Sequence, residues 1–344
     1  MFEIDFLQTS STAKSADAIT ARFSVPGRLT PAVIVVDAGY SAAAEVIADH
    51  IATWYGTRHV DVVLSTHPDA DHLNGIPALF PLLSVGELLI HEPRLHGHDG
   101  TDADCTAIHE VVAAAKAASV PVAEPFQGLT RLGGALTVVG PSRDYYEKLL
   151  NDQVGTTAVL KSVRHMLAEA ASRGRQKVRS VVPWAPAETL VDDSGGTSAR
   201  NNSSIVVSLS AEGYRALLTG DAGVPALTRA CDYMDVIGIS GLPLNLLQIP
   251  HHGSRHNLDG KLLDRILAMS TGGAHGVQGA VASASALDPA HPHPAVTNAV
   301  KRRSFSAYSN MRGHLCCPLS GPGRPWPVAS EEPWLDEEEG AEAA

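Results

Sequence analysis

The stretch that decides the fold reads Val60-Asp61-Val62-Val63-Leu64-Ser65-Thr66-His67-Pro68-Asp69-Ala70-Asp71-His72. Its first half is apolar and β-branched, which predicts a buried strand over residues 59–65. Pro68 has no N–H to continue a strand, so we expect the chain to turn there and a helix to begin near Asp71. The resulting strand-to-helix loop carries four metal-competent side chains: His67, Asp69, Asp71 and His72.

These four side chains suit two metal ions better than one. His67 and Asp69 alternate along the chain and project together, while the adjacent Asp71 and His72 can serve a second centre. Imidazole and carboxylate are ordinary ligands of zinc, and of manganese or iron where oxygen ligands are numerous. The alternative is a polar loop in which Asp71 caps the helix. Four ligands gathered behind one buried strand favour the metal site.

Composition narrows the class of protein. The chain has 344 residues, 44% hydrophobic and 18% charged, which is typical of a globular protein with a sizeable core. A formal net charge of −11 argues against a broad basic surface for long nucleic acid, although a local patch remains compatible with it.

The lack of a targeting signal and of a paired cysteine framework predicts a cytoplasmic protein. The start, Met-Phe-Glu-Ile-Asp, lacks the basic and apolar regions of a signal peptide, and no apolar run is long enough to span a bilayer. Four cysteines, Cys105, Cys231, Cys316 and Cys317, show no paired framework. The Cys316-Cys317 pair could bind metal, but two idle thiols are the favoured interpretation.

A strand, a loop with polar residues at its end and a helix recur in this order along the chain. Further strands are expected at 30–37, 204–209, 214–219, 244–249 and 279–283, and helices at 42–55, 225–234, 259–269 and 295–303. Most strand ends are followed by His or Asp: Asp37, the 67–72 loop, Asp221, the 251–256 loop and His291. A fold that gathers strand ends at one edge would bring these tips together.

Two further segments support less specific predictions. Residues 145–181 carry a helical pattern with the basic residues Lys161, Arg164, Arg173, Arg175, Lys177 and Arg179, which form either a solvated face or a surface for an anionic polymer. A histidine-rich loop at 91–109 reads as solvated in preference to a third ligand set. We expect one domain over 1–320 with a helical insertion at about 143–200, then an acidic, disordered tail over 321–344.

Three motifs, in this order, resemble the metallo-β-lactamase fold hydrolases, and in particular the hydrolase domain of ComEC-type competence proteins. They are His67-x-Asp69-x-Asp71-His72, then Asn201-Asn202-Ser203-Ser204 leading to Leu218-Thr219-Gly220-Asp221, and Pro250-His251-His252-Gly253-Ser254 followed by His291-Pro292. The resemblance covers roughly residues 2–310. It implies a four-layer αβ/βα sandwich of two mixed β-sheets flanked by helices. The stretch Thr9 to Asp17 departs from the family because it lacks glycines, and the membrane channel of the competence proteins is absent.

The resemblance also implies the ligand set. His67 and Asp69 would hold one metal, Asp71 and His72 the other, and Asp221 would bridge both. One of His251 and His252, with a preference for His252, and His291 would complete the site. The cofactors would be two divalent ions, with Zn²⁺ first and Mn²⁺ as the competitor.

The chemistry expected from such a centre is hydrolysis by a metal-activated hydroxide, with Asp71 essential. His251 or His256 would protonate the leaving oxygen. A phosphodiesterase or nuclease acting on a phosphodiester or nucleic-acid substrate is the first hypothesis. The alternatives are a hydrolase of a small ester or lactone, and a non-catalytic, metal-stabilised regulatory module with partners in a multi-protein system.

Overall fold

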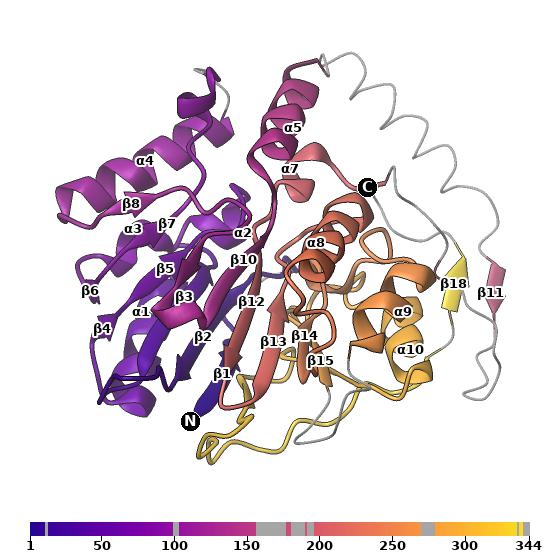
Figure 1. Ribbon diagram of the computed structural model, residues 1–344. Helices are drawn as coiled ribbons and strands as arrows, with labels where there is room; N and C mark the ends of the chain where they lie inside the picture. The colour runs from indigo at the N-terminus through magenta and orange to yellow at the C-terminus, as the bar shows by residue number, and fades with distance from the viewer. Residues whose placement is uncertain are drawn as a thin grey trace.

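The computed structural model describes residues 1–10, 13–98, 103–155, 177–179, 190, 196–269, 279–335 and 337–339. Two seven-stranded sheets lie face to face, and helices cover both outer faces (Figure 1). The predicted four-layer αβ/βα sandwich of two mixed sheets is therefore confirmed.

The first sheet has the strand order β17-β1-β2-β3-β5-β7-β8. Its pairing is antiparallel from β17 to β3 and parallel from β3 to β8. Its strands are β17 (Leu315–Cys317), β1 (Phe2–Phe6), β2 (Ala18–Phe23), β3 (Ala32–Ala38), β5 (Val62–Leu64), β7 (Leu88–Leu89) and β8 (Val122–Ala123).

The second sheet has the order β16-β15-β14-β13-β12-β10-β9. It is antiparallel from β9 to β13 and parallel from β13 to β16. Its strands are β16 (Ser306–Ser309), β15 (Gly279–Ala282), β14 (Leu246–Gln248), β13 (Tyr214–Leu218), β12 (Val206–Ala211), β10 (Leu136–Gly140) and β9 (Thr130–Arg131). A short pair, β4 (His59–Val60) with β6 (Ser84–Val85), lies apart from both sheets.

The helices fall into three sets. Those packed on the first sheet are α1 (Ala43–His50), which continues as a π-helical turn over Ile51–Tyr55, α3 (Ile76–Leu79) and α4 (Ala103–Ala117). Those packed on the second are α8 (Val224–Val236), α9 (Gly260–Ala268) and α10 (Pro294–Arg302). The remaining ones are α2 (Ala70–Leu73), α5 (Arg143–Gly155) and α7 (Ala199–Asn202).

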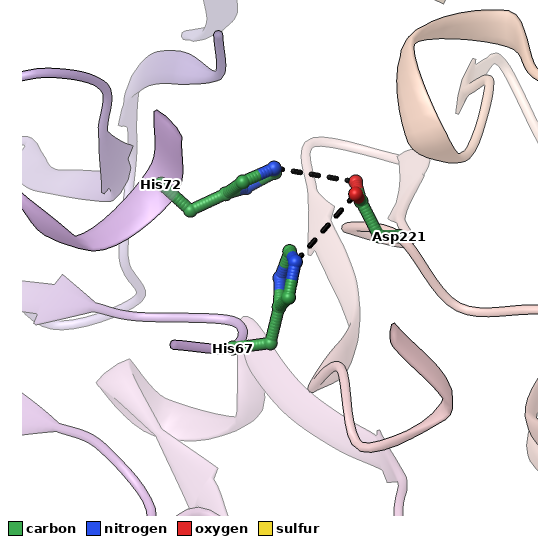
Figure 2. Close-up of side chains that lie close together, drawn as sticks. All are labelled: His67, His72 and Asp221. Atoms are coloured by element: carbon green, nitrogen blue, oxygen red, sulfur yellow. Dashed lines mark ion pairs between the residues drawn. The ribbon is translucent and has the colours of Figure 1, made fainter. Parts of the chain in front are cut away.

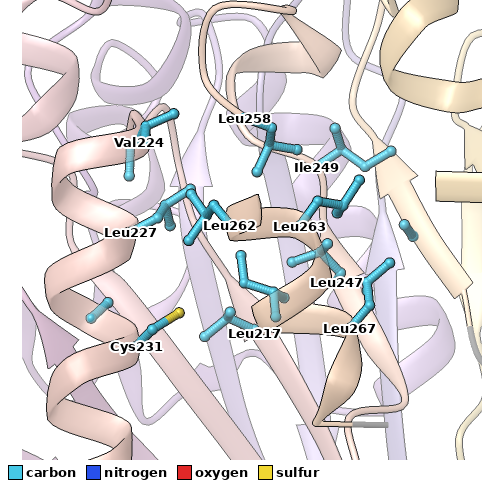
Figure 3. Packing of buried hydrophobic residues seen from close by; sticks show 14 of the residues in the cluster. Leu217, Val224, Leu227, Cys231, Leu247, Ile249, Leu258, Leu262, Leu263 and Leu267 are labelled. Carbon is cyan, nitrogen blue, oxygen red and sulfur yellow. The ribbon is translucent and has the colours of Figure 1, made fainter. Parts of the chain in front are cut away.

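Three hydrophobic clusters occupy the three interfaces between layers. Side chains alternate along each strand, so Ala216 and Leu218 of β13 join the cluster between the sheets while Leu217 joins the cluster under the helices. Figure 3 shows this outer cluster, where Leu217 and Leu247 of the sheet meet helix side chains such as Leu262. Because both faces of each sheet are covered, the strands are apolar on both sides, as the sequence indicated.

The parallel strands place the polar tips at one edge. β3 and β5 run parallel in the first sheet, and β13, β14 and β15 run parallel in the second. The loops that follow the carboxyl ends of these strands carry the predicted site residues. Ligands of α/β sheets commonly bind at such an edge.

Two predicted elements around the deciding stretch are interrupted. The strand expected over 59–65 is split at Asp61, whose carboxylate accepts the Val33 N–H (2.8 Å) and an Arg28 N–H (2.8 Å). The helix expected after Asp71 breaks into α2 and α3 at Gly75. A Cβ at this position would lie 2.0 Å from the Ala38 carbonyl oxygen, so only glycine fits against β3.

The structure describes the predicted insertion only in part. Helix α5 ends at Gly155, and residues 156–176 and 180–189, with the basic residues Lys161, Arg164, Arg173 and Arg175, lie outside the described residues. Residues Lys177–Arg179 form strand β11 and not the helix predicted there. β11 pairs antiparallel with β18 (Glu337–Glu339), which places Lys177 opposite Glu339 and Arg179 opposite Glu337.

The C-terminal segment contacts the body of the protein as far as residue 335. The Arg324 side chain binds Glu3 and Asp5 of β1, the Leu335 carbonyl accepts a hydrogen bond from Asn298, and Trp334 lies under Lys301 of α10. Residues 324–335 of the segment predicted to be disordered thus make defined contacts, and Arg324 is one of several partners of two buried acids. Residues 336 and 340–344 lie outside the described part of the chain.

The structure also bears on the predictions about membrane spans and about metal binding by the cysteines. No helix within the described ranges is both long and apolar enough to cross a membrane. Cys316 faces Asp5 while Cys317 packs against the cluster between the sheets, and burial raises the pKa of both thiols. Adjacent strand residues point to opposite faces, so these cysteines do not form a metal pair.

Candidate dinuclear metal centre

The site residues come from both sheets. His67, Asp69, Asp71 and His72 follow β5 of the first sheet, with Asp71 and His72 in the first turn of α2. Asp221 follows β13, and His251 and His252 follow β14 of the second sheet. The two sheets therefore each contribute half of the site, as the sequence interpretation required.

Asp221 joins the two halves. Its Oδ2 lies 3.5 Å from His67 Nε2, and its Oδ1 lies 3.3 Å from His72 Nε2 (Figure 2). All three side chains are at most 2% exposed. One carboxylate thus presents its two oxygens to two different histidines, which is the geometry expected of a bridging ligand.

Around these three residues further candidate ligands make two groups of contacts. In the first group, His67 Nε2 lies 3.5 Å from Asp69 Oδ2, and His251 Nε2 lies 3.5 Å from Asp221 Oδ2. In the second, Asp71 Oδ2 lies 3.7 Å from His72 Nε2 and 3.1 Å from His252 Nε2. Atoms bound tetrahedrally to zinc at its usual distances are roughly 3.3–3.6 Å apart. Within the described residues the compact groups of ligand atoms are His67, His72 and Asp221, then Asp71, His72 and His252, and then Asp17, Asp37 and His72, so Asp69 and His251 lie at the edge of these groups.

Each of the four histidines is oriented through its Nδ1 atom. His72 Nδ1 lies 2.7 Å from Asp37 Oδ2, and His252 Nδ1 lies 2.8 Å from the Ser283 carbonyl oxygen. His67 Nδ1 lies 3.0 Å from Thr66 Oγ1, and His251 Nδ1 lies 3.1 Å from Asn257 Oδ1. With Nδ1 as the donor, the Nε2 lone pair of each ring is directed at the carboxylates, as in histidines that bind metal.

Several buried atoms of the site have no hydrogen-bond partner. They are His67 Nε2, His72 Nε2 and Asp221 Oδ1. A buried polar atom left unpaired costs about 1–3 kcal/mol, so it usually has a ligand. These three unpaired atoms face one another across the centre (Figure 2). The donor set of nitrogen and carboxylate oxygen therefore fits two divalent cations, one in each group.

The carboxylates make the site attractive to positive charge. Burial alone would lower the pKa of His67 and His252, but the nearby aspartates outweigh it and raise the pKa of each to about 9. Burial would likewise raise the pKa of Asp221, yet His251, His72 and His67 hold it well below the usual range. A divalent cation competes with protons for these nitrogen atoms.

Asp37 fixes the loop that runs from Thr66 to His72. Its carboxylate accepts the Thr66 N–H (2.7 Å), the Thr66 hydroxyl (2.6 Å) and the His72 Nδ1–H (2.7 Å). The alternative in which Asp71 caps a helix is wrong, since the N-cap position of α2 is Asp69 and no side chain caps it.

Asp17 is the residue that the sequence interpretation missed. It is buried, accepts a hydrogen bond from Gln248 Nε2 (2.9 Å) and lies 3.6 Å from His72 Nδ1. Its N–H donates to the Asp71 carbonyl (3.1 Å). The turn before it lacks the glycines of the resembling family, so the sequence offered only an isolated acid before a strand.

The backbone at the adjacent residues His251 and His252 is strained. His251 and His252 have φ of 49° and 56°, followed by Gly253 at 95°. Left-handed conformations cost non-glycine residues about 1–3 kcal/mol and concentrate at functional sites. This turn carries both imidazoles, and of the two His252 shares a compact group of ligand atoms with Asp71 and His72. The preference for His252 as the ligand stays a prediction.

His291 and His256 occupy different positions. His291 Nδ1 lies 3.1 Å from Asp288 Oδ2, and its ring stacks 5.9 Å from that of His251. Within the described residues, His291 belongs to none of the compact groups of ligand atoms, and the same holds for His251 and Asp69. His256 is half-buried, and its backbone contacts Ser254 and Thr197. Its predicted role as an acid stays a prediction.

The side chains of His91 and His96 in the histidine-rich loop are buried, whereas Arg94 and Leu95 are exposed. His91 stacks on Phe126 and Tyr146, and His96 lies between Glu124 and Glu147. The favoured interpretation as a solvated loop is therefore wrong for these two residues. Apolar and charged partners from 124–147, distant in sequence, determine their environment.

No known protein-family profile and no curated protein matches the chain. Solved structures similar to it include a candidate metallo-β-lactamase from Thermotoga maritima, 10% identical over 70% of this chain and 93% of its own, with a TM-score of 0.36. The metallo-β-lactamase SMB-1 is 12% identical over 77% and 92%, with a TM-score of 0.34. A diphosphatase of the PhnP family is 11% identical over 77% and 83%, with a TM-score of 0.34.

Proposed function

We propose that this protein is a metal-dependent hydrolase of the metallo-β-lactamase fold, most specifically a phosphodiesterase or nuclease with two divalent cations. The observation that carries the proposal is the buried Asp221 carboxylate, which faces a histidine with each oxygen. Paired cations that share a carboxylate supply Lewis acidity and lower the pKa of a coordinated water toward neutrality, the chemistry used in phosphoryl hydrolysis.

The residues have distinct roles in this proposal. His67, Asp69, Asp221 and His251 would hold one cation, and Asp71, His72, His252 and Asp221 the other. Asp37 orients His72 through its Nδ1–H. His251 takes a ligand position, so His256 is left as the candidate that protonates the leaving oxygen. A mixed nitrogen and oxygen donor set suits Zn²⁺, with Mn²⁺ as the competitor.

The test is the hydrolysis of bis-p-nitrophenyl phosphate and single-stranded DNA by purified protein loaded with each metal. Asp71→Ala removes a ligand that lies 3.1 Å from His252 Nε2 and should abolish turnover. We expect a loss of at least about 100-fold, because an incomplete metal site loses its transition-state stabilisation.

The control is Asp61→Ala, which removes a carboxylate outside the site at the start of β5. It should retain turnover in the fraction of protein that stays folded. Full activity in Asp71→Ala, or metal-loaded protein that hydrolyses no ester, would contradict the proposal. Hydrolysis of neutral esters alone would instead favour the small-ester alternative.

A further inference from the structure

A buried hydrogen bond joins the two sheets next to the metal centre. Asp17 stands immediately before β2 of the first sheet, and its Oδ2 accepts a hydrogen bond of 2.9 Å from Gln248 Nε2. Gln248 is the last residue of β14 in the second sheet. Both side chains are only 1% exposed, so water does not compete for this bond. The bond is therefore a direct polar link between the two halves of the site.

In the first sheet, Asp17 is fixed to the loop that carries Asp71 and His72. Its backbone N–H donates to the Asp71 carbonyl (3.1 Å), and its own carbonyl accepts the Gly39 N–H (2.8 Å). Its Oδ2 lies 3.6 Å from His72 Nδ1, on the side of the ring that faces away from Asp221. A displacement of Asp17 would therefore displace the backbone at Asp71.

In the second sheet, Gln248 holds the loop that carries Asp221. Its Oε1 accepts the N–H groups of Thr219 (2.8 Å) and Gly220 (3.2 Å), the two residues before Asp221. These contacts fix the orientation of the amide, because a flipped amide would place its NH₂ group against two N–H donors and its oxygen against a carboxylate. Gln248 thus connects the backbone before Asp221 to the side chain of Asp17.

The compact group of Asp17, Asp37 and His72 does not form a third cation site. His72 Nδ1 lies 2.7 Å from Asp37 Oδ2 and donates its proton there, while its Nε2 faces Asp221. Neither ring nitrogen is left for a cation between the two acids. The contact of the Asp17 side chain with Gln248 therefore has to account for this buried carboxylate.

We infer that Asp17 and Gln248 are positioning residues, which set the distance between Asp71 and Asp221 and thereby the affinity of the centre for one of its cations. The inference rests on the proposed function, in which both aspartates hold that cation. Ligand atoms have to be held to within about 0.5 Å of their working geometry, and buried polar contacts between rigid elements supply that precision. The Asp17–Gln248 bond spans the one boundary, between the two sheets, that this pair of ligands has to cross.

Two other roles compete with this one. In the first, the negative charge of Asp17 acts on His72 without the help of Gln248, so Asp17→Asn would be as harmful as Asp17→Ala. In the second, the bond only adds to the stability of the fold, so its loss would leave the cation affinity of the folded chain unchanged. In the positioning role, Asp17→Asn retains an oxygen that accepts from Gln248 Nε2 and therefore retains the affinity.

The experiment measures Zn²⁺ affinity by competition with a chelating dye, and coordination geometry from the visible absorption of the Co²⁺-loaded chain. We expect Asp17→Ala to bind one of the two ions about 10- to 100-fold more weakly, the loss typical of a removed contact that orients ligands, and to show altered Co²⁺ bands. Asp17→Asn should match the unaltered chain in both measurements. Gln248→Met breaks the same bond from the second sheet and should weaken binding at least as much. Adding Asp17→Ala to it should cause no further loss, because the two side chains act as a unit.

Asn245→Ala is the matched control. Asn245 precedes β14 at its other end, and its Oδ1 accepts the Arg215 N–H (2.9 Å), so it joins neighbouring strands as Gln248 does but away from the centre. This variant should unfold at a lower urea concentration in the metal-free state and keep its cation affinity.

Unchanged affinity in either Asp17→Ala or Gln248→Met, measured on folded protein, would overturn the inference, as would equal losses in Asp17→Asn and Asp17→Ala. Because the bond is broken from both sides, the test stands on either variant if the other does not fold. Cation affinity that depends on Asp17 in a chain that hydrolyses no phosphodiester would refute the proposed function and leave this inference standing.

Discussion

At the scale of single residues, the site depends on how each imidazole is held. In His67, His72, His251 and His252 one nitrogen is hydrogen-bonded to a neighbouring oxygen, and the other is directed at an aspartate. Such outer hydrogen bonds fix the ring orientation and the tautomer, and losing them typically costs 10- to 100-fold in metal affinity. The sequence shows which residues are ligand types but not which ring nitrogen each one presents.

His251 and His291 give a prediction at this scale. His251 Nε2 lies 3.5 Å from Asp221 Oδ2, whereas His291 is directed at Asp288 through Nδ1. We expect His251→Ala to lower the metal content by up to one ion per chain, because the first group loses a ligand. His291→Ala should keep the full content. Elemental analysis of the purified variants measures both, and equal losses would restore His291 as a ligand.

At the scale of elements, the loop after β7 shows how burial changes a histidine. His91 lies two residues after the end of β7. Its ring is enclosed by Phe126, in the loop between β8 and β9, and by Tyr146 of α5. Burial lowers the pKa of His91 from 6.5 to about 3, so this residue is neutral in the folded protein. Its Nε2 has no hydrogen-bond partner. The loop therefore acts as an apolar wall and not as a ligand set.

This burial predicts a pH dependence of folding. Between pH 6.5 and about 3 the unfolded chain protonates His91 and the folded chain does not, so stability falls as the pH falls through this window. His91→Phe removes this contribution. As the pH falls through the window, the free energy of unfolding of the variant should therefore rise relative to that of the unaltered chain, by up to about 1.4 kcal/mol per pH unit. Urea unfolding at several pH values measures the difference.

His59→Phe is the control for this prediction, because the His59 side chain is 50% exposed. Its unfolding free energy should follow that of the unaltered chain across the same pH range. Parallel curves for the unaltered chain and His91→Phe would show that His91 does not titrate on unfolding.

At the scale of the whole molecule, the C-terminal segment closes onto the first strand. Arg324 donates to both oxygens of Glu3 (3.0 Å each) and to Asp5 Oδ2 (2.7 Å). Both acids are fully buried, and Asp5 also accepts from His50 and Tyr55. Glu3 is also paired with Arg22, so removing Arg324 takes one cation from two buried acids that keep other partners.

We therefore expect Arg324→Gln to lower the free energy of unfolding by about 1.5–3 kcal/mol, the range for lost hydrogen bonds to charged groups. Arg58→Gln, which removes an exposed pair with Asp49 at 3.8 Å, should change it by less than about 1 kcal/mol. Thermal and urea unfolding of the two variants give the comparison. Similar small changes in both would mean that the segment does not stabilise the first sheet.

Much of the fold follows from sequence alone. The apolar runs over 30–37, 214–219 and 244–249 predicted β3, β13 and β14 to within a few residues, because both faces of these strands are covered and periodicity is a local signal. The four ligand types between His67 and His72 were likewise visible, since their spacing depends on one loop.

Tertiary structure decided the rest. Asp17 reaches the centre only through contacts with Gln248 and the Asp71 backbone, and His251 enters it through a strained turn. Arg200 and Asp69 are 131 residues apart and meet only because the two sheets pack face to face. Which side chains share a site depends on contacts between distant elements, and no local pattern in the chain encodes such contacts.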